Sequence, residues 1–75
     1  DLLRDWLADC CELDAEAYTS NASLRESYEA WCGRNGEKAM SAKAFAKQLR
    51  AKGCIAERTT SERGWRGVRM TDDAF

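Results

Sequence analysis

The sequence predicts a small, mainly helical α+β domain: a winged helix-turn-helix with three helices and a C-terminal β-hairpin. Apolar residues recur at helical spacing in three stretches before residue 53. β-forming residues and a Gly-containing turn follow Cys54, and positive charge gathers in the same part of the chain. Because 75 residues provide for only one core, we expect residues 1–75 to form one winged-helix domain. We also expect this domain to be a piece of a larger intracellular protein.

The helices are expected near residues 2–12, 22–34 and 42–52. The Thr19-Ser20-Asn21 run supplies cap chemistry for the second helix and Ser41 for the third, and Gly53 ends the third. The apolar positions at helical spacing predict the core. They are Leu3, Trp6, Leu7, Cys10 and Cys11 in the first helix, Leu24, Tyr28, Trp31 and Cys32 in the second, and Phe45 and Leu49 in the third.

The hairpin is expected between residues 55 and 71, with strands at 55–60 and 65–71 around a loop at 61–64. By strict alternation Val68 and Met70 share the inward face, while Trp65 lies on the opposite, more open face beside two glycines. Trp65 is therefore a candidate for stacking on bases.

Charge is divided unevenly along the chain. Residues 41–71 contain eight Lys or Arg and two Glu, a balance of +6, whereas the first forty residues have a balance of −5. With Asp72 and Asp73 the formal total is −1. A basic helix followed by a basic hairpin is the electrostatic pattern of a nucleic-acid reader, which the near-neutral total conceals.

On the third helix Lys43, Lys47 and Arg50 form one stripe, opposite the apolar face by the 100° step. Such a helix offers cations to phosphates, with Gln48 as a donor to base edges and Ser41 at the helix start. The hairpin adds Arg58, Arg63 and Arg66. The alternatives are an ordinary solvated helix face and a charged edge that discourages sheet pairing.

Other chemistries have little support in the sequence. There is no His, no Gly-rich phosphate loop and no paired carboxylate site, so we expect no enzyme activity of this segment and no cofactor. The four cysteines lack the close spacing of zinc ligands and are interpreted as reduced, buried thiols, with a zinc site or a disulfide as alternatives. No stretch is apolar enough to suggest a membrane partner.

Three motifs resemble the C-terminal winged-helix domain of phage and plasmid primase-helicases with a poxvirus-like superfamily-three helicase. They are Tyr28-x-x-Trp31-Cys32 followed by Gly36, then Ser41-x-x-x-Phe45-x-x-x-Leu49-x-x-x-Gly53, and then Arg63-Gly64-Trp65-Arg66-Gly67-Val68-Arg69-Met70. Trp6-Leu7-x-x-Cys10-Cys11-Glu12 fits the same pattern. Met70, where Leu or Ile is usual, and a more acidic first half are the departures.

The resemblance implies a DNA-contacting domain of an enzyme that starts or restarts replication of a mobile element inside a bacterial host. Primase and helicase chemistry would lie upstream, on residues outside this chain. DNA, duplex or forked and largely independent of sequence, is the expected partner. The rival hypothesis is a winged helix that docks proteins, using its acidic first helix to hold a loader or its own helicase ring.

Overall fold

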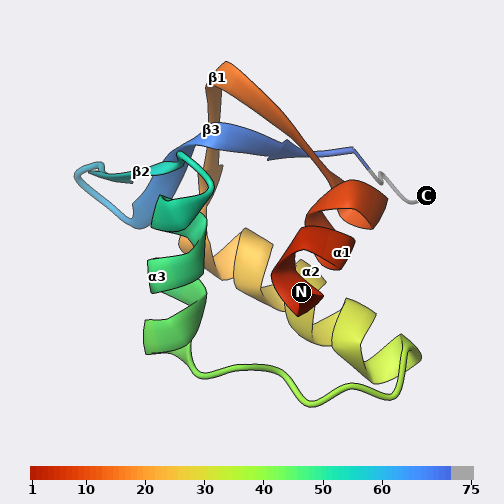
Figure 1. Cartoon of the computed structure of the whole chain (residues 1–75). Helices are drawn as coiled ribbons and strands as arrows, with labels where there is room; N and C mark the ends of the chain where they lie inside the picture. The colour runs from red at the N-terminus through yellow and green to blue at the C-terminus, as the bar shows by residue number, and fades with distance from the viewer. Residues whose placement is uncertain (72–75) are drawn as a thin grey trace.

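The computed structural model describes residues 1–71, which form three α-helices and a three-stranded antiparallel sheet (Figure 1). The helices lie on one side of the sheet, and α3 and α1 occupy opposite ends of the helical layer. In chain order the elements are α1 (Leu2–Cys10), β1 (Cys11–Ser20), α2 (Asn21–Arg34), α3 (Ala42–Ala51), β2 (Ile55–Arg58) and β3 (Arg63–Met70). The predicted α+β class and the three predicted helices are confirmed.

The helix starts follow from capping chemistry. The Asp1 carboxylate accepts hydrogen bonds from the backbone N–H groups of Leu3 and Arg4, at 3.1 and 3.3 Å. The Ser20 and Ser41 hydroxyls cap α2 and α3 in the same way, three residues ahead of the N–H group that each accepts. These side chains satisfy donors that the first turn of a helix leaves unpaired.

The core joins one aromatic side chain from each helix. Trp6, Tyr28 and Phe45 lie with ring centroids 5.0–5.7 Å apart, and each is at most 1% exposed. The segment before α3 is tied to this cluster, because the Met40 N–H donates to the Tyr28 hydroxyl and Arg25 donates to the Met40 carbonyl. Every residue predicted for the core from helical spacing is buried.

The predicted two-stranded hairpin is only part of the sheet. The first helix ends at Cys10, not at residue 12, and residues 11–20 form β1, which pairs with β3 to give the order β1-β3-β2. The sequence prediction missed this strand because Asp14 and its neighbours show no clear alternation. The register explains why: after Asp14↔Gly67 the next pair is Tyr18↔Arg66, so three residues of β1 form a bulge.

The backbone conformation at Gly67 changes which side chains of β3 point toward the core, so the predicted orientation of Trp65 was wrong. The Gly67 φ of 108° lies in a region that L side chains rarely adopt, and this residue faces the β1 bulge. The kink interrupts the alternation, so Trp65 and Val68 both turn inward, at 4% and 0% exposure. Trp65 is therefore not the open residue that the sequence predicted, while Val68 and the half-buried Met70 do face the core as predicted.

Candidate nucleic-acid interface

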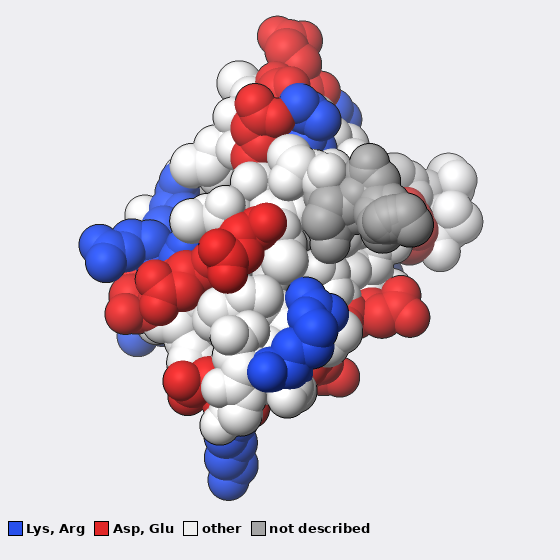
Figure 2. Space-filling view, turned by 90° about the vertical axis from the view of Figure 1, so that its right-hand side faces the viewer, with Lys and Arg blue, Asp and Glu red and all other residues white. Residues whose placement is uncertain are grey.

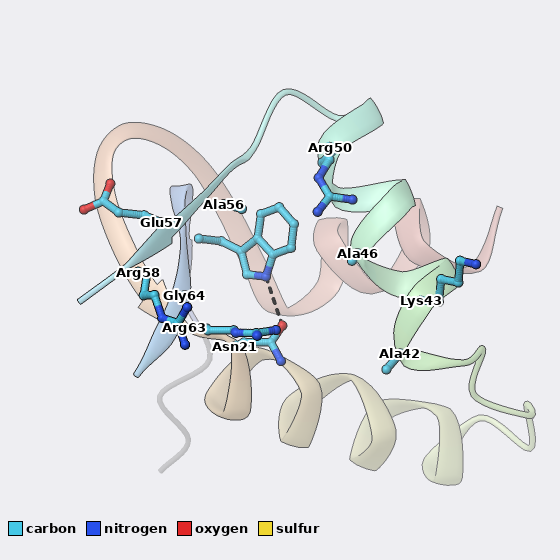
Figure 3. A pocket seen from close by; sticks show the side chains of 11 residues that line it. Asn21, Ala42, Lys43, Ala46, Arg50, Ala56, Glu57, Arg58, Arg63 and Gly64 are labelled. Carbon is cyan, nitrogen blue, oxygen red and sulfur yellow. Dashed lines mark hydrogen bonds between the residues drawn. The ribbon is translucent and has the colours of Figure 1, made fainter. Parts of the chain in front are cut away.

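A groove of about 510 Å³ lies between α3 and the β2–β3 hairpin. Its walls bring together cations from both elements, as Figure 3 shows: Lys43 and Arg50 from α3, Arg58 and Arg63 from the hairpin. Small residues of α3 and β2, including Ala46 and Ala56, leave the space between the walls open. The two basic regions predicted from the sequence thus form one concave surface.

Only part of the predicted α3 stripe faces the groove. Lys43 and Arg50 are two helical turns apart and line it, whereas Lys47 is exposed but does not. Gln48 is half-buried and lies about 140° around the helix from Lys43, so it is turned away from the groove. Ser41 is exposed and serves as the cap of α3, because its hydroxyl accepts a hydrogen bond from the backbone nitrogen of Ala44 at 3.2 Å.

The hairpin presents Arg58 and Arg63 as a directly opposed pair. The loop beyond them is closed by Thr59, whose N–H donates to the Glu62 carbonyl at 2.8 Å and whose hydroxyl accepts from the Glu62 N–H at 3.1 Å. Within residues 1–71 neither arginine forms an ion pair or a hydrogen bond with another side chain. Both guanidinium groups are exposed.

Trp65 supports the groove from beneath. Its indole N–H donates to the Asn21 side-chain oxygen at 3.0 Å, and the Arg50 guanidinium lies 5.6 Å from its ring centroid. These contacts join β3 to the start of α2 and to α3. Because the ring is buried and covered by Arg50, the predicted stacking of Trp65 on a base is not available in this arrangement.

Arg66 was predicted as a hairpin contact for nucleic acid, but it is engaged within the protein. It forms two hydrogen bonds with the Glu57 carboxylate, at 2.6 and 2.9 Å, and donates to the Glu16 carbonyl at 3.2 Å. Its guanidinium also lies 5.5 Å from the Tyr18 ring centroid. The hydrogen bonds from Arg66 lower the pKa of Glu57 below its ordinary value. Arg66 therefore links β1, β2 and β3.

Asn21 is a groove residue that sequence reasoning recognised only as part of a helix start. An indole N–H can only donate, so the oxygen of the Asn21 amide must face Trp65. The amide nitrogen is then left as a further donor at the groove wall. No sequence pattern distinguishes this Asn from an ordinary residue in the first turn of a helix.

The opposite side of the molecule has a different charge distribution. Figure 2 views the α1 side, and there acidic and basic side chains are interspersed among uncharged ones. Two acids that do not line the groove have partners: Glu12 pairs with Arg69, and Asp9 accepts a hydrogen bond from the Trp31 indole at 2.9 Å. Glu57 is the acidic residue among those that line the groove, but its carboxylate points away from the groove (Figure 3) and pairs with Arg66.

All four cysteines are buried, and burial raises the pKa of the Cys54 thiol. Over residues 1–71 no group of three or more His, Cys, Asp or Glu side chains is arranged to hold a metal ion. The same residues contain no helix with the length and apolar character needed to cross a membrane.

A family model described as Poxvirus D5 protein-like matches residues 1–67, which is most of the chain. No curated protein and no solved structure matches. The family agrees with the resemblance to poxvirus-like primase-helicases that the sequence motifs indicate.

Proposed function

The chain belongs to the Poxvirus D5 protein-like family, and on this premise we propose that it is a DNA-binding accessory domain of a mobile-element primase-helicase. We further infer a winged helix-turn-helix fold, with α3 as the DNA-facing helix and the β2–β3 hairpin as the wing. The element order supports this inference: α2 and α3 are consecutive helices, and the hairpin follows α3 directly and lies beside it (Figure 1).

The observation that carries the proposal is the convergence of four cations on one groove. Lys43, Arg50, Arg58 and Arg63 have no carboxylate partner within residues 1–71, although acids are as frequent as bases in the chain. All four residues line the same groove, so their unpaired charges lie on one surface of the protein. A polyanion such as a DNA backbone satisfies all four at once.

Binding of this kind is largely independent of base sequence. Lys and Arg on the groove walls are suited to phosphate oxygens, and the predicted base-reading residue, Gln48, is turned away. If all four cations contact phosphates, the slope of log affinity against log salt on duplex DNA is about −3 to −4. We expect weak, strongly salt-dependent affinity.

The test is fluorescence anisotropy on duplex, forked and single-stranded DNA at several salt concentrations. The triple variant K43E/K47E/R50E should abolish binding. The matched control is R4E/R34E/K38E, which reverses three exposed cations outside the groove and changes the net charge by the same amount. Equal losses in the two variants, or a greater loss in the control, would overturn the proposed interface. Among single changes, Lys43→Glu should weaken binding more than Lys47→Glu, because Lys47 does not line the groove.

The rival function is docking to a loader protein or to the helicase ring through the acidic first helix. Its support is the negative balance of the first forty residues. Two of these carboxylates have partners within the protein: Asp9 accepts a hydrogen bond from Trp31, and Glu12 forms an ion pair with Arg69. Absence of DNA binding by the unaltered domain at low salt would favour this rival over the groove.

A further inference from the structure

The hairpin separates its charges by face. Glu57 binds Arg66, and Glu62 accepts a hydrogen bond from the Tyr18 hydroxyl at 3.2 Å. Both contacts lie on the face where the Tyr18 ring covers Gly64, because Glu57 is directly opposite Gly64 in the register. The alternating residues Arg58 and Arg63 turn to the other face and line the groove. Both acids of the hairpin thus have partners on one face, and Arg58 and Arg63 lie on the opposite face, which lines the groove.

Arg58 and Arg63 also repel each other. They are Cα partners in the antiparallel register, so their Cβ atoms lie about 4.5–5.5 Å apart on the same face of the sheet. Like charges in this position destabilise a strand pair. Inside the part of the chain that the structure describes, no carboxylate forms an ion pair with either arginine.

We propose that Arg58 and Arg63 together bind one phosphate group of a nucleic-acid backbone, and that the free hairpin is destabilised by their repulsion until this phosphate arrives. A phosphate has several acceptor oxygens and can receive hydrogen bonds from two guanidinium groups at once. Asn21, whose amide nitrogen is available, and Lys43 line the same groove (Figure 3). The inference rests on the proposed function, since DNA is what supplies the phosphate.

The consequence is a trade-off between stability and binding. Replacing either arginine by Gln removes the repulsion, so R58Q and R63Q should each melt a few degrees higher than the unaltered protein at low salt. Each should also bind duplex DNA several-fold more weakly, with a salt slope smaller by about 0.9. Because the repulsion and the shared phosphate both need the two arginines, R58Q/R63Q should gain little more in melting temperature, and lose little more in salt slope, than a single variant does.

Two further measurements sharpen the test. Inorganic phosphate, compared with chloride at equal ionic strength, should raise the melting temperature of the unaltered protein more than that of R58Q. The matched control is R34Q, which changes an exposed arginine at the end of α2 and should leave the DNA affinity and the phosphate effect unchanged. Gln replaces Arg at both hairpin sites, so differences in β-strand propensity between replacement residues do not affect the comparison of their melting temperatures.

The possible failures are distinguishable. If R58Q and R63Q melt at or below the original temperature, or keep the original salt slope, the phosphate pair is wrong. Loss of binding in K43E/K47E/R50E would then still support the groove as the DNA interface. If the unaltered domain shows no DNA binding and no stabilisation by phosphate, the proposed function and this inference both fall.

Discussion

Replacing Phe45 by Ala should bring this protein close to unfolding. The Phe45 side chain is 1% exposed, and its ring centroid lies 5.7 Å from that of Trp6 and 5.0 Å from that of Tyr28. The Arg25 guanidinium lies 5.2 Å from the same centroid. Truncation to Ala therefore removes the α3 contribution to an aromatic cluster that all three helices share.

The expected loss follows from two contributions. Burial of a Phe side chain is worth about 1.5–3 kcal/mol, and each of the two aromatic pairs adds about 0.5–1.5 kcal/mol, which together give roughly 2.5–6 kcal/mol. Measured Phe→Ala changes of about 3–5 kcal/mol lie within this range. At about 0.05–0.15 kcal/mol per residue, the whole protein has only about 4–11 kcal/mol of unfolding free energy. The melting temperature should fall by more than about 12 °C.

Thermal and urea unfolding followed by far-UV circular dichroism provides the measurement. Ile55→Ala is the control, because Ile55 is 65% exposed and its truncation should cost much less. A Phe45→Ala protein that melts within two degrees of the original would show that the aromatic cluster is not the centre of the core.

Three other predictions concern the hairpin and the thiols. Gly64→Ala should destabilise the protein, because the added methyl would overlap the Tyr18 ring, and thermal melts should show partial recovery in Tyr18→Ala/Gly64→Ala. The pKa of Glu57 is lowered by Arg66, so its stabilising contribution is present above the ordinary pKa of 4.5 and is lost as pH falls through the lowered value; Glu57→Gln should lower the melting temperature at pH 7 but make little difference in acid. A chelator should leave the melting temperature unchanged, with metal content measured in parallel.

Helices and core were predictable because their signals are local and redundant. Phe45 and Leu49 repeat at helical spacing, Ser41 supplies a cap and Gly53 a stop, and each of these is sufficient to suggest α3. The burial of Trp6 and Trp31 needed no such redundancy, since large apolar side chains are rarely left exposed in so small a protein. Trp65 shows the limit, because its burial depends on a kink at Gly67.

The first strand could not be predicted because its stability comes from its partner. Residues 11–20 carry few β-formers, and the bulge after Asp14 removes the alternation that would mark a strand. Pairing with β3, which is remote in sequence, determines the conformation. The role of Arg66 was missed for the same reason: Glu57, Glu16 and Tyr18 come together only after three strands have paired.

Two residues that the sequence predicted as nucleic-acid contacts, Trp65 and Arg66, hold the groove in shape. Trp65 anchors the base of the hairpin to Asn21 and supports Arg50, while Arg66 fixes the other face of the hairpin to β1. A hairpin joined to α3 only by a short turn would swing relative to the helix, and its arginines would spend little time opposite Lys43. By contacting elements on both of its faces, the hairpin keeps the two basic walls at one separation. The cations that meet DNA in the proposed function are therefore few, and their arrangement depends on a larger set of residues that do not touch it.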